Sequence, residues 1–268
     1  MQGRVSLNIS EDLCFVHDPS VGSGKTRTMA KGLFFRYKGR LCSGESAGFG
    51  LPVLKTGIKT CFPSLAAMST MGETSIIKEF SMDRFIVWRI SNRKAPAWFG
   101  FFMEFIVSEY LKRPSLQQRL LMLRDKMFSL FAVHSSMICG KKIGTCRIRY
   151  QTVPDGLIIS VDAGDLPGKS RLIMLNEVDG RAFNRLRIND LVLRDNEVPA
   201  WKEVPRAAAL ESPLLDVGIS ISCGMNQDQS LSCVYCGREV ASELDWAGLA
   251  VLHSRRMFSY RVYIHPLV

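Results

Sequence analysis

Residues 145–162 read TCRIRYQTVPDGLIISVD, and this run indicates the fold more clearly than any other part of the chain. Before Pro154, apolar and polar residues alternate with the period of two that a half-buried strand requires. In Pro154–Asp155–Gly156, proline presets φ and glycine accepts positive φ, so a turn is expected there. A second, apolar run follows Gly156. The run therefore predicts a β-hairpin.

Similar strand patterns continue on both sides of this hairpin. The pair Asp179–Gly180 favours a two-residue hairpin turn between residues 172–178 and 182–188. Residues 74–90 are rich in β-branched and aromatic residues, with a polar turn expected at Ser81–Met82–Asp83. Residues 12–18 make a poor buried strand. Further strands are expected at residues 33–38, 51–54, 59–62, 191–194, 217–222, 231–235, 248–253 and 258–264.

The periodicity changes after Pro96 and becomes helical. Residues 98–112 and 115–131 both fit a helix, with Pro114 between them and Ser115 as an N-cap. The sequence lacks a regular strand–helix alternation, which argues against Rossmann and TIM-barrel folds. We expect a mainly β protein: a large antiparallel β-sandwich, or barrel-like sandwich, with an αα-hairpin inserted around residues 97–132. The whole chain, residues 1–268, is expected to form one domain.

The charge of the chain favours anionic partners. The formal net charge is +10 and the pI is about 9.3. Eight lysines and arginines lie between residues 25 and 72, and Glu45 is the one acidic residue among them.

The sequence also bears on location. We find neither a signal peptide nor an apolar run long enough to cross a bilayer. The eight cysteines are scattered and are interpreted as reduced thiols, so a cytoplasmic protein is expected.

Two short motifs are incomplete. Val21 to Thr26 resembles the end of a phosphate-binding loop, but the glycine required five residues before Gly24 is replaced by Pro19, so a surface loop is expected. Cys233 and Cys236 have the spacing of half a zinc site, which Cys223 and His253 would complete. A Cys223–Cys233 disulfide is a further alternative. Ordinary β-strand cysteines are the favoured interpretation, and neither metal nor cofactor is predicted.

A candidate site centres on the glycine-rich residues 43–52. Glu45 is expected to be its central carboxylate and His253 an acid–base group. Arginine and lysine can hold carboxylate, sulfate or phosphate groups. The expected ligand-positioning cations are Arg36, Lys38, Arg84, Arg147 and Arg149.

Three functions remain open at this point. The first is binding, or processing, of a carbohydrate or small anionic ligand on a basic sheet face. The second is a non-enzymatic assembly protein that oligomerises through the helical hairpin, whose apolar face could instead contact a membrane surface. The third is nucleic-acid binding, which the charge supports but which no recognition motif favours. The sequence leaves open whether the protein is an enzyme.

Overall fold

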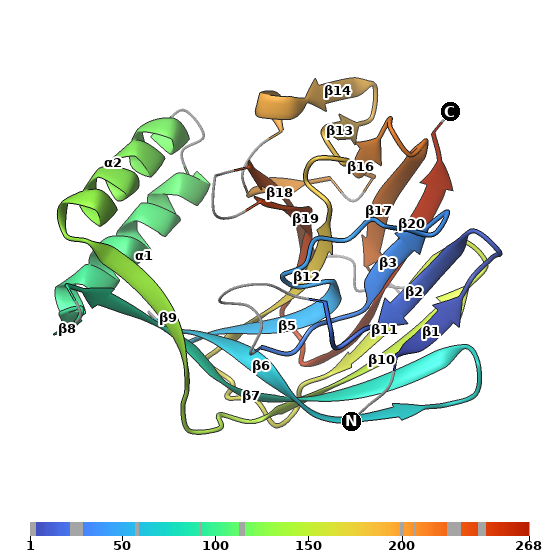
Figure 1. Ribbon diagram of the computed structural model, residues 1–268, viewed down its shortest axis with the longest axis horizontal. Helices are drawn as coiled ribbons and strands as arrows, with labels where there is room; N and C mark the ends of the chain where they lie inside the picture. Colours follow the sequence, from blue (N-terminus) through green and yellow to red (C-terminus); the bar gives the residue numbers. More distant parts are fainter. Residues whose placement is uncertain are drawn as a thin grey trace.

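The computed structural model describes residues 4–21, 29–56, 59–91, 93–112, 116–198, 201–205, 207–223, 232–240 and 245–267. Strands dominate it, and two helices form a hairpin at one end of the molecule (Figure 1). All strand pairs are antiparallel. The prediction of a mainly β fold with large antiparallel sheets and one inserted αα-hairpin is confirmed. The prediction of one domain stays a prediction.

The larger sheet has sixteen strands among the described residues. Their order is β14-β13-β16-β17-β20-β11-β10-β7-β6-β5-β12-β19-β18-β15, and β8 and β9 also pair with β7. The strands are β5 (Phe49–Thr56), β6 (Lys59–Thr70), β7 (Ser75–Ile90), β8 (Arg93–Lys94), β9 (Val133–Cys139), β10 (Thr145–Val153), β11 (Gly156–Asp162), β12 (Arg171–Val178), β13 (Arg185–Ile188), β14 (Leu191–Arg194), β15 (Lys202–Val204), β16 (Ala209–Ser212), β17 (Val217–Cys223), β18 (Ser232–Val240), β19 (Asp245–His253) and β20 (Met257–Pro266).

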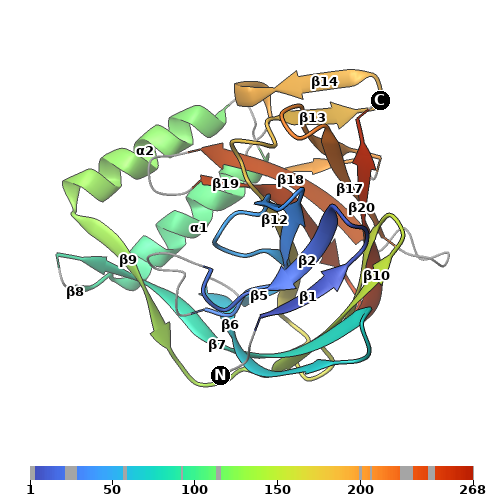
Figure 2. The same cartoon turned by 45° about the vertical axis from the view of Figure 1, so that its right-hand side comes forward.

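The smaller sheet lies within the curve of the larger one (Figures 1 and 2). It consists of β1 (Val5–Asn8), β2 (Leu13–His17), β3 (Phe34–Tyr37) and β4 (Arg40–Leu41). Phe15 and Phe35 from this sheet pack against Phe49 of β5, with ring centroids 5.3 and 6.2 Å apart. These rings belong to a hydrophobic core shared by both sheets. Burial of such large apolar surfaces is the main stabilising contribution to sheet-on-sheet packing.

Three local predictions are corrected. Residues 81–83 form no turn, because β7 continues from Ser75 to Ile90. The polar side chain of Asp83 has a partner across the sheet, since Ser64 donates a hydrogen bond to it over 2.8 Å, and Met82 is fully buried. Residues 13–17 do form a largely buried strand.

The third correction concerns Asp179–Gly180, which does not join paired strands. β12 pairs with β5 and β19, whereas β13 pairs with β14 and β16. By contrast, the predicted hairpin at Pro154–Asp155–Gly156 is confirmed, because Val153 of β10 pairs with Gly156 of β11 next to the turn.

The helical hairpin comprises α1 (Ala97–Lys112) and α2 (Gln117–Leu130). Phe99 of α1 packs against Phe128 of α2, with ring centroids 6.3 Å apart. Pro114 and the proposed N-cap Ser115 lie outside the described residues, as does the run Gly22 to Thr26. Neither described helix is long and apolar enough to span a bilayer.

Gly50 has a specific role where β5 passes the core. Its φ is +71°, and a Cβ atom there would lie 2.6 Å from Cε1 of Tyr150. The Tyr150 hydroxyl donates a hydrogen bond of 2.9 Å to the main-chain oxygen of Gly50. Glycine lets the backbone adopt this conformation and approach the tyrosine ring closely.

Candidate functional site

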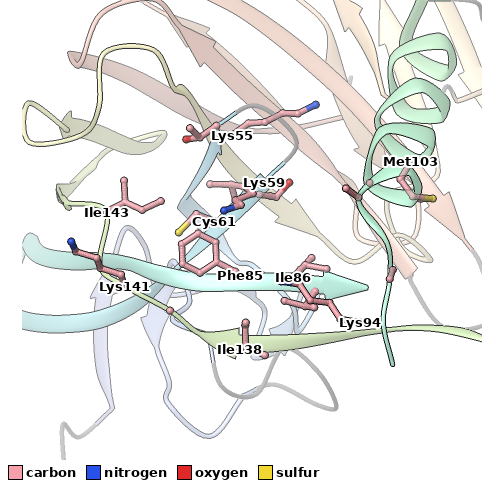
Figure 3. A pocket seen from close by; sticks show the side chains of 18 of the residues that line it. Lys55, Lys59, Cys61, Phe85, Ile86, Lys94, Met103, Ile138, Lys141 and Ile143 are labelled. Atoms are coloured by element: carbon pink, nitrogen blue, oxygen red, sulfur yellow. The ribbon is translucent and has the colours of Figure 1, made fainter. Parts of the chain in front are cut away.

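A pocket of about 1220 Å³ lies between helix α1 and the β5–β6–β7 region of the large sheet (Figure 3). Pockets that bind small molecules are commonly about 300–1,000 Å³, so this one is large enough for a ligand of considerable size. Elements far apart in the sequence form its wall. The lining residues include Val53, Cys61, Phe85, Ile86, Val87, Ala97, Gly100, Met103, Ile138, Ile143 and Ile173.

Five lysines also line the pocket: Lys55, Lys59, Lys94, Lys141 and Lys142. Lys55 and Lys59 lie on the β5–β6 hairpin, Lys94 lies on β8, and the last two follow β9. None of the described lining residues is an aspartate or glutamate. In Figure 3, Lys141 lies at the left and Lys94 to the right of Lys59. Lys59, Lys94, Lys141 and Lys142 therefore bring positive charge to the pocket, which favours an anion.

The rest of the lining is mainly apolar. Figure 3 shows Phe85, Ile86 and Ile138 below Lys59, with Met103 on α1 at the side. Thr56 and Thr60 are the only residues with a side-chain hydroxyl among the described lining residues. A ligand in this pocket would therefore contact aliphatic and aromatic carbon over most of its surface, and ammonium groups at a few points.

Cys61 contributes a thiol to the wall but is poorly suited to nucleophilic chemistry. The residue is almost fully buried, and burial raises the pKa of its thiol to about 12. A thiol must lose its proton to act as a nucleophile. At neutral pH the Cys61 side chain therefore acts as a small apolar group of the wall.

The residues predicted from the sequence lie elsewhere, since none of the seven lines this pocket. Arg36 lies on β3, where its Nη1 donates to the main-chain oxygen of Gly39 over 3.4 Å. Lys38 follows β3, and its Nζ is 5.2 Å from the centroid of the Tyr37 ring. These two cations therefore belong to the small sheet and its turn.

The other predicted cations lie on the large sheet. Arg84 of β7 forms an ion pair with Asp83 over 3.6 Å. Arg149 of β10 donates to Oγ of Ser75 over 3.1 Å. Arg147, on the same face of β10 and also exposed, is opposite Asp162 of β11 and Glu79 of β7 in the strand register. Each of the three has an acidic or polar neighbour within the sheet.

His253 ends β19, and its ring stacks on that of Phe258 with centroids 4.5 Å apart. Nδ1 of His253 accepts a hydrogen bond of 2.9 Å from the backbone amide of Arg255. None of the eight cysteines is in a disulfide, so the alternative Cys223–Cys233 bridge is not formed. Within the described ranges, no three His, Cys, Asp or Glu side chains are grouped to hold a metal ion.

The glycine-rich segment around Glu45 does surround a carboxylate, but that carboxylate belongs to Glu177 of β12. The side chain of Glu45 is exposed, whereas Glu177 is fully buried. Glu177 accepts hydrogen bonds of 3.1 Å from the amides of Ser46 and Gly48, and closer ones from the amide of Ala47 and the hydroxyl of Ser46. A Cβ atom at Gly44 would lie 2.5 Å from Oε1 of Glu177.

Burial raises the pKa of Glu177, while the hydrogen bonds from residues 46–48 and the charge of Lys31 oppose this effect. The amine of Lys31 donates to the main-chain oxygen of Ser46 over 2.8 Å. These contacts fix the loop 43–48 to β12. The sequence signal for Glu177 is a carboxylate near the end of a strand whose middle, Leu172 to Leu175, is apolar. Because an unpaired buried charge is very costly, such a carboxylate needs polar partners.

Comparisons with known proteins leave the family of this chain open. No family model matches it, and no curated protein matches it. A solved structure described as a protein in the glycosyl hydrolase family 38 from Enterococcus faecalis matches with a TM-score of 0.44 and 9% identity. The match covers 100% of this chain but 31% of that one. The structure of HI1317 matches with a TM-score of 0.33 and 6% identity, over 98% of this chain and 100% of the other. Both TM-scores are below 0.5, so neither likeness supports a function.

Proposed function

We propose that this protein binds a small anionic ligand with an apolar body in the pocket between α1 and the sheet. The observation that carries the proposal is the presence of five lysines, without a carboxylate among the described lining residues, around an apolar interior. Like charges gathered in one pocket repel each other, and a bound anion removes that repulsion. Of the two ligand classes expected from the sequence, the pocket supports the anionic one.

A carbohydrate fits this lining less well. Sugar hydroxyls lose hydrogen bonds to water on binding, so a sugar site must supply polar partners. Beyond the lysines, the described lining supplies the hydroxyls of Thr56 and Thr60. An apolar body with one or two acidic groups matches the distribution of carbon and ammonium groups in the wall.

The test is titration with 1-anilinonaphthalene-8-sulfonate, a fluorescent probe with an aromatic body and one sulfonate group. We expect saturable binding that weakens as the salt concentration rises. The double variant Lys59→Ala/Lys94→Ala should bind about 5- to 30-fold more weakly, since each lost ionic contact contributes roughly 0.5–1 kcal/mol. Gly100→Phe should also weaken binding, because Gly100 lines the pocket on α1.

The matched control is Lys169→Ala, which removes an exposed lysine that does not line the pocket. It should bind the probe as the wild type does. Equal losses in Lys169→Ala and the double variant would mean that the probe responds to overall charge, and the proposal would be wrong.

A further inference from the structure

Helix α1 carries two apolar faces, although a helix on the surface of a protein usually needs one. Phe99, Met103 and Ile106 form the buried face. Trp98, Phe101 and Phe105, spaced three and four residues apart, form a second face that is 53%, 62% and 57% exposed. Side chains at this spacing lie on one side of a helix. We call these three residues the outer aromatic face.

The exposure of large apolar side chains is concentrated in the hairpin. Of the eleven large hydrophobic residues that are exposed in the described part of the chain, six belong to α1 and α2. α2 contributes Met122, Leu123 and Leu130. Isolated exposed apolar residues are common on soluble proteins, but a grouped set indicates an interaction surface.

The charge around this surface selects the partner. Residues 93–131 contain seven lysines and arginines and three acidic residues, a net charge of +4. Arg93, Arg119 and Lys126 are exposed, and none of the three lines the pocket. A second copy of the chain would bring the same positive charge to the interface, whereas an anionic lipid surface has the opposite charge.

We propose that the hairpin docks on the surface of an anionic membrane through its outer aromatic face. Trp98, Phe101 and Phe105 enter the region between lipid headgroups and acyl chains, where aromatic side chains are favoured. Exposed cations of the hairpin contact the lipid phosphates. Neither helix crosses the bilayer. This docking does not depend on a ligand in the pocket.

Flotation of the full chain with vesicles tests the proposal. Vesicles of phosphatidylcholine alone are compared with vesicles of phosphatidylcholine and phosphatidylglycerol, at low and high salt. We expect the protein to float with the anionic vesicles, less so at high salt, and not with the neutral ones. Phe101→Ser/Phe105→Ser should reduce the bound fraction at least tenfold.

The control variant is Leu191→Ser/Leu214→Ser, which removes two exposed apolar side chains elsewhere on the surface. It should float as the wild type does. Both double variants are first compared with the wild type by thermal unfolding, and Trp98→Ser replaces Phe101→Ser/Phe105→Ser if that variant fails to fold. Equal flotation of the hairpin variant and the wild type would overturn the proposal. A failure to bind anionic vesicles would also overturn it. In that case light scattering would test for dimers, and dimers that Phe101→Ser/Phe105→Ser dissociates would show that the face binds a second copy of the chain.

Discussion

Nζ of Lys78 lies 3.0 Å from Nδ1 of His17, and this contact joins β7 of the large sheet to β2 of the small sheet. Lys78 is fully buried and also donates to the main-chain oxygens of Lys31 and Gly32, over 3.0 and 2.7 Å. Its Nζ lies 5.8 Å from the centroid of the Tyr150 ring. None of these four partners is a carboxylate, so the amine is held by neutral groups.

The first prediction concerns pH. Burial lowers the pKa of Lys78 to about 7, whereas an unfolded lysine titrates near 10.4. Between pH 7 and 9, Lys78 therefore keeps its proton in the unfolded chain but loses it in the folded protein. Because the unfolded chain binds more protons, the contribution of Lys78 to the free energy of unfolding rises with pH. We expect the wild type to gain roughly 2 kcal/mol relative to Lys78→Met over this range.

Urea unfolding of both proteins at pH 7, 8 and 9 measures this difference. Burial and, to a lesser extent, the charge of Lys78 lower the pKa of His17 to about 4. Because burial is the larger cause, His17 stays neutral between pH 7 and 9 in both proteins, so the difference between the two slopes isolates Lys78. Parallel pH profiles would show that Lys78 keeps its ordinary pKa in the folded protein.

The second prediction concerns the two glutamates of the glycine-rich region. Glu177→Gln places an amide group among the backbone N–H donors of residues 46–48. Two sets of donors would then face each other in a buried site, so we expect a loss of about 2–4 kcal/mol in the free energy of unfolding. Glu45→Gln changes an exposed side chain and should shift stability by less than about 0.5 kcal/mol.

Both variants are compared with the wild type by urea unfolding at pH 7. An equal effect of the two substitutions would contradict the buried, hydrogen-bonded state of Glu177.

The third prediction compares two glycines with the same backbone conformation. Gly50 and Gly72 have φ values of +71° and +67°. At Gly50 a Cβ atom would lie 2.6 Å from the Tyr150 ring, whereas at Gly72 nothing lies within 4 Å. Gly72→Ala should cost about 1 kcal/mol from backbone strain alone. Gly50→Ala should cost about 1–3 kcal/mol more, because the buried tyrosine must move.

Thermal and urea unfolding of these two variants give the difference directly. A smaller loss for Gly50→Ala than for Gly72→Ala would show that Tyr150 does not pack against β5 as described.

Features set by neighbouring residues could be predicted from the sequence. The β10–β11 hairpin follows from Pro154–Asp155–Gly156 and the alternation beside it. The change of period after Pro96 located both helices to within two residues of their observed starts. These patterns reflect backbone preferences and the side-chain periods of strands and helices, which act over a few residues.

The candidate site could not be predicted in the same way. Lys55 and Lys141 line one pocket although 85 residues separate them in the sequence. Glu177 binds a loop about 130 residues before it, and its own strand, RLIMLNEV, does not indicate which loop it contacts. The sequence indicates Glu45, the acidic residue within that loop, as the central carboxylate of a ligand site and does not single out Glu177.

The amino-acid sequence by itself determined a mainly β protein, its inserted helical hairpin and its positive charge, because composition and short-range periodicity carry that information. Only the tertiary structure decided that residues 81–83 continue a strand, which carboxylate the glycine-rich loop surrounds, and which lysines share a pocket. Those outcomes depend on which strands pair, and pairing between distant segments is set by the packing of the whole core rather than by local preference.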